Sequence, residues 1–242
     1  MTPVPGSTWR VRVAVDGPAG SGKSTVARRL AVRLGLSYID TGAMYRAVAW
    51  LATVRGIPFD DQAALGRLAE SLSFSFPPDR SNPAPDARPR VVVNGEDLTA
   101  QIRRPEVADA ASRVSTHEGV RRSLVAQQRR LGESGGEGGR GVVMDGRDVG
   151  TVVFPDAEVK FFLTAPFEIR VDRRAAELAE QGSQVDRVWL AGDMARRDER
   201  DRTRTHSPLA LAKDAILLDT GPLTIDQVVD RMAEAVRKVK EI

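Results

Sequence analysis

Cysteine is absent from this chain of 242 residues, and histidine occurs only twice. The lack of cysteine excludes disulfides, thiolate zinc sites and thiol nucleophiles, and two histidines are too few for a histidine-rich metal site. No stretch approaches 18 consecutive apolar residues, and the opening MTPVPGSTWR lacks the long apolar segment of a signal peptide. From these absences we expect a cytoplasmic protein without a membrane span.

A strong excess of one charge is missing as well. The 36 lysines and arginines face 33 acidic residues, so the net charge is only +3. Such an excess is compatible with nucleic acid or with nucleotide phosphates as a partner, and it does not choose between them. With 41% hydrophobic residues, a chain of this length can form one large α/β domain or a core with a small insertion.

The most informative stretch is the phosphate-loop pattern G-x-x-x-x-G-K-[ST], which reads GPAGSGKS in this chain. It follows a β-branched run, VRVAVD, and precedes a helical pattern, which is the context that such a loop requires. Its glycines let successive N–H groups point at phosphate oxygens, Lys23 reaches the β- and γ-phosphates, and the Ser24 hydroxyl suits Mg²⁺. The residues expected to bind the donor nucleotide are Gly17, Pro18, Ala19, Gly20, Ser21, Gly22, Lys23, Ser24 and Thr25.

Short apolar runs alternate with helical patterns along most of the chain. This alternation predicts a parallel sheet with helices on both faces, and the phosphate loop then lies at the carboxyl ends of the strands. Further strands are expected at residues 36–39, 141–145, 159–163 and 215–218, and helices at 24–34, 105–114, 116–131, 168–180 and 185–204, with a last helix capped by Thr224 and Gln227.

Two segments interrupt this alternation. Five prolines between residues 77 and 89 predict an irregular surface connection. The Asn94-Gly95 pair between two short apolar runs then predicts a hairpin, and a hairpin inside an α/β chain suggests an inserted subdomain. Ser115 with Glu118 predicts a capping box, and the glycine-rich tract 132–141 is expected to be a flexible linker.

Polar residues collect where two of the predicted strands end. Asp145 follows a buried strand and is placed to hold Mg²⁺ or a water bound to it. Thr41, Tyr45 and Arg46 follow the strand at 36–39 and suit a phosphate and a sugar. A capped helix with an ordinary surface arginine explains these three residues equally well.

An arginine-rich run, RRDERDRTR, occupies residues 196–204. As a helix it places Arg197, Arg200 and Arg204 on one face. A solvated charged surface is one interpretation, because three acids lie in the same run. The use of arginine throughout favours phosphate binding, since planar guanidinium groups match phosphate oxygens better than lysine does.

Three later motifs, IDTGAMYR, VMDGRDVGTVVFPDA and RRDERDRTR-x-x-SPL, together with the phosphate loop, resemble bacterial-type cytidylate kinase from about Val11 to the end of the chain. The resemblance implies an α/β fold: a phosphate-loop kinase core with a five-stranded parallel sheet flanked by helices, an inserted NMP-binding subdomain and a short lid. A single domain is implied, with its core at about 10–72 and 114–242, the inserted CMP-binding subdomain at about 73–113 and the lid at about 194–207.

The same resemblance implies transfer of the γ-phosphoryl group of ATP to CMP or dCMP, with Mg²⁺. Its matching positions give Thr41, Tyr45, Arg46 and Arg147 to the CMP phosphate and sugar, Ser112, Arg121 and Asp148 to cytosine, and Arg197 and Asp201 to the ribose. Lys23, Arg200 and Arg204 become the catalytic residues, and Ser24 and Asp145 the metal site, directly or through water. A cytoplasmic monomer without nucleic-acid or membrane partners is expected.

Other activities stay open at this point. A guanine-reading Asn-Lys-x-Asp motif is absent, which argues against a switch GTPase. A kinase for another small acceptor, such as UMP, AMP or shikimate, would carry a similar loop. A nucleic-acid-dependent ATPase could use the arginines as a backbone groove, and it would then show strong salt-dependent binding.

Overall fold

The computed structural model describes residues 11–79, 81–82, 84, 87–135, 140–180 and 182–240. Its centre is a sheet of five parallel strands in the order β2-β6-β1-β7-β8. The predicted α/β class and five-stranded parallel sheet are therefore confirmed. The strands are β1 (Val11–Asp16), β2 (Ser37–Asp40), β6 (Gly141–Gly146), β7 (Val159–Thr164) and β8 (Ile216–Asp219).

The strand register brings three acids to one edge of the sheet. Asp16 ends β1 opposite Gly146, and Asp40 ends β2 opposite Asp145. The phosphate loop leaves the sheet directly after Asp16, so the same edge carries the loop and all three carboxylates. Open parallel sheets bind their ligands at this carboxyl edge.

Helices cover both faces of the sheet. Helices α1 (Lys23–Leu34) and α8 (Ile225–Lys240) pack against one face through a shared apolar core. Helix α5 (Glu118–Glu133) packs on the other face, where its Val125 meets residues of β1, β2 and β6. Both faces of the inner strands are thus buried, which explains why their sequences are apolar without alternation.

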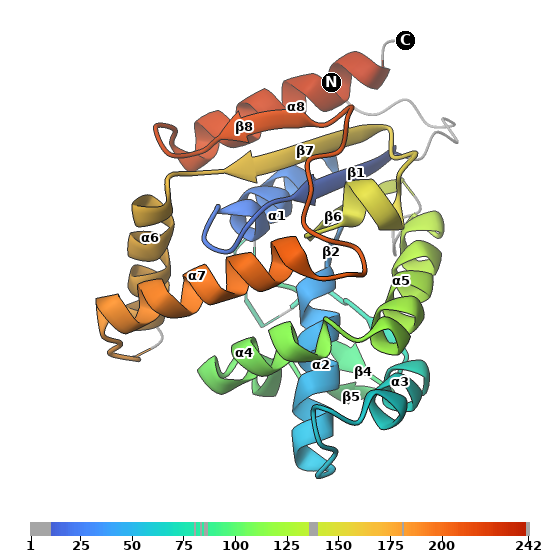
Figure 1. Ribbon diagram of the computed structural model, residues 1–242. Coiled ribbons are helices and arrows are strands. Elements are labelled where there is room, and N and C mark those ends of the chain that lie inside the picture. The colour runs from blue at the N-terminus through green and yellow to red at the C-terminus, as the bar shows by residue number, and fades with distance from the viewer. Residues whose placement is uncertain are drawn as a thin grey trace.

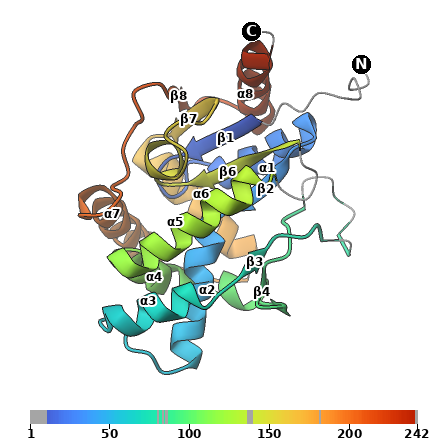
Figure 2. The ribbon, with the colours of Figure 1, turned by 90° about the vertical axis from the view of Figure 1, so that its right-hand side faces the viewer.

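A second cluster of elements lies below the sheet in Figure 1. It contains α2 (Thr41–Val54), α3 (Gln62–Glu70), α4 (Pro105–Val114), the 3₁₀ turn η1 (Gln101–Arg103) and a three-stranded antiparallel sheet of β3 (Phe74–Ser75), β4 (Val92–Val93) and β5 (Glu96–Asp97). The predicted hairpin is confirmed, because Asn94 and Gly95 both have positive φ at the β4–β5 turn. Figure 2 shows this small sheet beside α2, away from the central sheet.

Helices α6 (Phe167–Glu180) and α7 (Arg187–Thr203) form a pair with a small apolar core of their own. Figure 1 shows α7 crossing between the sheet and α4. Asp186 caps the start of α7 by accepting from the backbone N–H of Trp189 at 2.7 Å. Because α7 ends at Thr203, the arginine-rich run 196–204 forms the last turns of this helix.

Local capping tests the sequence interpretation at three places. The Thr224–Gln227 capping box is confirmed, because each residue's side chain accepts from the other's backbone N–H. The capping box at Ser115 is wrong: its hydroxyl donates to the Ser112 carbonyl at 2.8 Å, and α5 begins only at Glu118. Gly35 ends α1 in the left-handed conformation, as its sequence position indicates.

The glycine-rich tract does not begin as a linker. Gly132 is buried in the last turn of α5, where an added Cβ would lie 2.4 Å from the Phe154 ring. A side chain at this position would displace α5 from the segment after β6. Residues 136–139 of the tract lie outside the described residues, as do 80, 83, 85 and 86 of the proline-rich connection. None of the described helices is long and apolar enough to cross a membrane.

Candidate active site

The phosphate loop connects β1 to α1. Gly17, Gly20 and Gly22 all have positive φ, and a Cβ on Gly20 would lie 2.6 Å from the Arg170 carbonyl oxygen. Lys23 folds over the loop and its Nζ donates to the Pro18 carbonyl at 3.1 Å. The glycines are therefore required both by the backbone conformation and by the close approach of α6.

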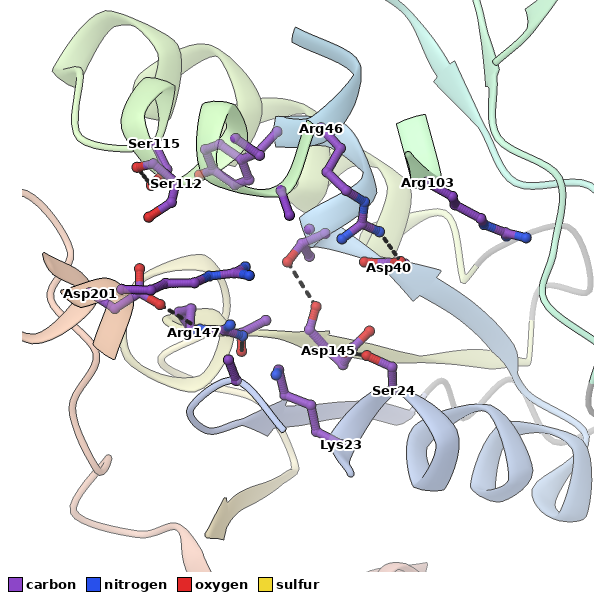
Figure 3. Close-up of a pocket in the computed structure, with 18 of the residues that line it drawn as sticks. Lys23, Ser24, Asp40, Arg46, Arg103, Ser112, Ser115, Asp145, Arg147 and Asp201 are labelled. Carbon is purple, nitrogen blue, oxygen red and sulfur yellow. Dashed lines mark hydrogen bonds and ion pairs between the residues drawn. The ribbon is translucent and has the colours of Figure 1, made fainter. Parts of the chain in front are cut away.

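The loop opens into a cavity of about 230 Å³ at the carboxyl edge of the sheet (Figure 3). Eleven basic side chains line this cavity against only five carboxylates. Such a lining favours a ligand that carries several negative charges. The basic side chains are Lys23, Arg28, Arg46, Arg88, Arg103, Arg104, Arg121, Arg147, Arg174, Arg197 and Arg204, and the carboxylates are Asp40, Asp145, Asp148, Glu177 and Asp201.

Ser24 and Asp145 meet beside Lys23, as the sequence predicts. The Ser24 hydroxyl donates to Asp145 Oδ2 at 2.7 Å, and Tyr38 from β2 donates to Asp145 Oδ1 at the same distance. Burial and the nearby Asp40 carboxylate raise the pKa of Asp145, while Lys23 opposes the rise. A buried carboxylate beside a hydroxyl and an open cavity is an arrangement of hard oxygen ligands that a divalent cation can complete.

Lys23 sits in an environment that disfavours its own charge. Burial, together with the neighbouring Arg147 guanidinium, lowers the pKa of Lys23 to about 7. Burial and Arg147 also lower the pKa of Arg197, to about 10. The Nε of Arg197 is buried without a hydrogen-bond partner among the described residues. Both groups would be stabilised by an anion between them.

The segment after β2 supplies one wall of the cavity. Asp40 caps α2 by accepting from the Ala43 N–H at 3.0 Å, and its other oxygen accepts from Arg46 at 2.6 Å. Thr41 donates from its hydroxyl to the Asp145 carbonyl at 2.7 Å. The structure therefore brings the predicted residues Thr41 and Arg46 to the loop and ties them to the sheet edge.

A buried ion pair forms another part of the cavity lining. Arg121 from α5 donates to Asp148, and both side chains are almost inaccessible, with 3% and 6% exposed. Arg121 also donates to the Ser115 carbonyl at 3.1 Å and lies 5.3 Å above the Tyr45 ring. A donor fork and an acceptor are thus held at fixed positions, which suits recognition of a base edge.

The end of α7 reaches the same cavity. Arg147 Nε donates to Asp201 Oδ2 at 2.8 Å, which joins the turn after β6 to α7. Arg204 lies 3.7 Å from both Asp148 and Asp201, and its Nε donates to the Ser207 carbonyl at 2.7 Å. The arginine-rich run is therefore not a solvated surface at these positions.

Arg200 does not line the cavity. Its Nη1 donates to Ser112 Oγ at 2.7 Å and to Asp109 Oδ1 at 3.1 Å, both on α4. The sequence interpretation puts Arg200 at the transferring phosphoryl group; that role stays a prediction, and in this structure the side chain binds α4 instead. The reason is that Asp109 and Ser112 offer Arg200 two acceptors that the sequence pattern does not reveal.

Comparison with known proteins identifies the family of the chain. The family model for cytidylate kinase matches residues 13–238, which include the phosphate loop, the turn after β6 and the end of α7. The chain belongs to the cytidylate kinase family. Within this family, the cytidylate kinase of Syntrophotalea carbinolica is 44% identical over 230 residues, which are 95% of this chain and 93% of that protein. The cytidylate kinase of Solibacter usitatus is 46% identical over 94% of this chain and 93% of its own length.

Longer relatives share the same family segment. The bifunctional pantoate ligase/cytidylate kinase of Synechococcus sp. (strain JA-3-3Ab) is 45% identical over the whole of this chain, which covers 43% of that protein. The chain therefore spans less than half the length of the bifunctional relatives that it matches. Solved structures are more distant: a sugar kinase from Janibacter sp. HTCC2649 is 16% identical over 95% of both chains, with a TM-score of 0.46.

Several residues that line the cavity are not predicted as site residues from the sequence. Tyr38 is the clearest case, because nothing local marks a tyrosine in a strand as a partner of Asp145. Arg174 and Glu177 lie on α6 in an ordinary charged helix pattern, and only the fold brings Glu177 to Arg88. The charged and tyrosine side chains that line the cavity without a predicted role are Arg28, Tyr38, Asp40, Arg88, Arg103, Arg104, Arg174 and Glu177.

Proposed function

We propose that this chain transfers the γ-phosphoryl group of ATP to CMP or dCMP, forming CDP or dCDP. One observation carries the proposal: a single cavity joins the phosphate loop at Lys23 to the buried pair of Arg121 and Asp148. The loop end suits a nucleoside triphosphate, and the paired end suits a base that offers both a donor and an acceptor. Membership of the cytidylate kinase family supports this acceptor.

The donor phosphates would lie on the loop between β1 and α1. Backbone N–H groups of the glycine turns and the positive end of α1 favour anions there. Lys23, whose pKa is lowered to about 7 by burial and Arg147, would become fully charged beside phosphate oxygens. Its present partner, the Pro18 carbonyl, is a weak acceptor that a phosphate can replace.

Ser24 and Asp145 fit Mg²⁺. Mg²⁺ in such sites uses one or two protein oxygens and completes its shell with water and phosphate, so a hydroxyl and one carboxylate are enough. No group of three or more acidic, histidine or cysteine side chains that could hold a metal ion occurs in the part of the chain that the structure describes. When bound, the ion neutralises charge that develops on the phosphate oxygens.

Cytosine would be read by the buried pair. Its N4 amino group donates, which matches a carboxylate oxygen of Asp148, and its O2 and N3 accept, which matches the Arg121 fork. Uracil presents an acceptor where cytosine has the amino group, so Asp148 would face an oxygen without a proton. Because the pair is buried, such a mismatch carries the full desolvation cost of the unpaired group.

The acceptor atom is a phosphate oxygen that is ionised at neutral pH, so the site needs no general base. The chain's contribution is to align two anions and offset their charge. Arg46, Arg147 and Arg197 converge on the cavity between the two ends and suit the acceptor phosphate and ribose. Asp201, held by Arg147 at 2.8 Å, offers an acceptor for a sugar hydroxyl.

The proposed activity also assigns roles to two segments of the chain. The segment 73–113 would act as the inserted CMP-binding subdomain and 194–207 as a lid, within one domain. We propose a cytoplasmic monomer that needs no nucleic acid or membrane.

A coupled ADP-release assay tests the activity. The purified protein is given MgATP with CMP, dCMP, UMP, AMP, GMP or shikimate in turn, and ATP alone measures hydrolysis. We expect turnover with CMP and dCMP, at least about 100-fold lower kcat/KM with UMP, and little ADP release without an acceptor. Preference for another acceptor, or DNA-stimulated ADP release without one, would contradict the proposal.

A further inference from the structure

Asp16 is a buried acid that the proposed chemistry does not use. It is the last residue of β1, directly before Gly17 of the phosphate loop, and only 4% of its surface is exposed. Burial raises the pKa of Asp16 to about 7, while two backbone N–H groups oppose the rise. Burial of an ionised carboxylate is energetically costly, so we expect Asp16 to form hydrogen bonds that the surrounding structure requires.

Those partners lie in the turn after β6. Asp16 Oδ1 accepts from the Val149 N–H at 2.9 Å, and Oδ2 accepts from the Gly150 N–H at 2.7 Å. Val149 and Gly150 begin η2 (Val149–Val153), a single turn of π-helix. The first N–H groups of any helical turn lack partners within it, and here one carboxylate satisfies two of them.

Asp148 stands immediately before this turn. Its carbonyl accepts from the Val152 and Val153 N–H groups at 2.9 and 3.1 Å, so η2 fixes the backbone of Asp148 on one side. The Asp16 carboxylate accepts from the Val149 N–H, which belongs to that same peptide group, and from the N–H of the next peptide, at Gly150. The Asp148 side chain, which pairs with Arg121, is therefore followed by a peptide group that is held at both its oxygen and its nitrogen.

The packing around the turn leaves little room for another arrangement. A Cβ on Gly146 would lie 2.6 Å from Thr41 Oγ1, and a Cβ on Gly150 would lie 3.2 Å from Lys160 Cδ and 3.3 Å from Asp16 Oδ2. The Lys160 stem thus packs beside Gly150, while its Nζ donates to the Pro155 carbonyl, after η2, and to Asp214. The N–H groups at the start of η2, next to Asp148, are held by Asp16.

We propose that Asp16 is a positioning residue for the base-reading pair, and that it sets the preference for cytosine by holding the backbone of Asp148. This inference rests on the proposed function. It also makes Asp16 a direct link between the donor loop, to which its peptide bond with Gly17 joins it, and the turn that reads the acceptor, to which it is hydrogen-bonded. If Asp16 acts by positioning, its substitution changes the preference for CMP over UMP and leaves ATP binding unchanged. If it only supports the fold, substitution does not change that preference.

The test compares Asp16→Asn with Lys160→Met. Asparagine keeps the shape but offers one acceptor to two N–H donors and sets its own amide donor against one of them. We expect faster amide hydrogen exchange at Val149 and Gly150 and a fall of about tenfold in the ratio of kcat/KM for CMP to that for UMP, with the KM for ATP within about twofold. Lys160→Met should lower the melting temperature and leave that ratio unchanged.

A folded Asp16→Asn protein with an unchanged CMP-to-UMP ratio would overturn the positioning role. Should Asp16→Asn not fold, Gly150→Ala decides the question together with Lys160→Met: its Cβ would lie 3.3 Å from the same carboxylate and 3.2 Å from the Lys160 stem, and it should lower the ratio whereas Lys160→Met leaves the ratio unchanged. An unchanged ratio there would equally overturn the proposal. A wild-type protein inactive with both CMP and UMP would instead contradict the proposed function, and the two amide exchange rates in Asp16→Asn would then decide the structural claim alone.

Discussion

The two ends of the cavity are built in different ways. The end proposed to bind the phosphoryl donor is one continuous segment, residues 17–25. Its glycines and lysine form a phosphate-binding loop that needs only a strand before it and a helix after it. The acceptor end is assembled from α2, α4, α5, the turn after β6 and α7, which meet only in the folded protein. A local motif therefore identifies the donor end, whereas the acceptor end is set by the fold. The two ends should respond differently to substitution.

The donor end should show the largest effect. Lys23→Ala removes the cation that meets the phosphates, and we expect kcat to fall by about 10²–10³-fold or more for every acceptor. The fold should survive, because among the described residues the Lys23 amine hydrogen-bonds only the Pro18 carbonyl. Steady-state ADP release and circular dichroism measure the two quantities, with Lys238→Ala on the exposed face of α8 as the matched control. Normal turnover in Lys23→Ala would refute the donor assignment.

The acceptor end should lose both activity and stability. Asp148→Ala removes the carboxylate that pairs with the buried Arg121 and lies beside the buried Arg204, which costs about 3–5 kcal/mol of unfolding free energy. We expect kcat/KM for CMP to fall about 100-fold or more while ATP binding changes little.

Urea denaturation and kinetics with CMP and UMP measure these effects, and Asp156→Ala is the control, since Asp156 forms an exposed ion pair with Arg12. An intact preference for CMP over UMP in Asp148→Ala would show that another group reads the base.

The difference between the two ends also explains which features could be predicted from the sequence. Helix and strand positions depend on local periodicity, and the loop, the Asn94-Gly95 hairpin and the Thr224 cap are all local signals that the structure confirms. Tyr38 and Arg174 reach the cavity only through sheet order and helix packing, which no local pattern encodes. Arg200 illustrates the converse: its place in a motif could not reveal that α4 binds it.

Replacing an arginine at the end of α7 by lysine should lower kcat less than removing a charge from the site does. Arg204→Lys keeps the positive charge but loses the planar fork beside Asp148 and Asp201. We expect kcat to fall about tenfold with a smaller change in the KM for ATP. Arg202→Lys on the exposed side of the same helix provides the control. Equal, near-normal turnover in both variants would mean that Arg204 contributes charge and no specific geometry.

The remaining prediction concerns the pH dependence of donor binding. Because the pKa of Lys23 is lowered to about 7, the free protein loses this charge as the pH rises above 7, and binding of the donor must restore it. Affinity for MgATP should therefore fall as the pH rises from about 7 to 9, by at most tenfold per pH unit, with proton uptake on binding. Calorimetry in two buffers of different ionisation enthalpy measures the uptake, and Lys23→Arg should show none. Uptake that persists in Lys23→Arg would assign the proton to another group.

The central claim is that one cavity holds both nucleotides at once, and an inhibitor that joins adenosine to cytidine through a polyphosphate chain tests it directly. We expect one molecule to bind per chain by calorimetry, to compete with both ATP and CMP, and to bind at least about 100-fold more weakly to Asp148→Ala. The adenosine-to-uridine analogue should bind the wild-type protein more weakly as well. Competition with ATP alone, or equal affinity for the two analogues, would contradict the account.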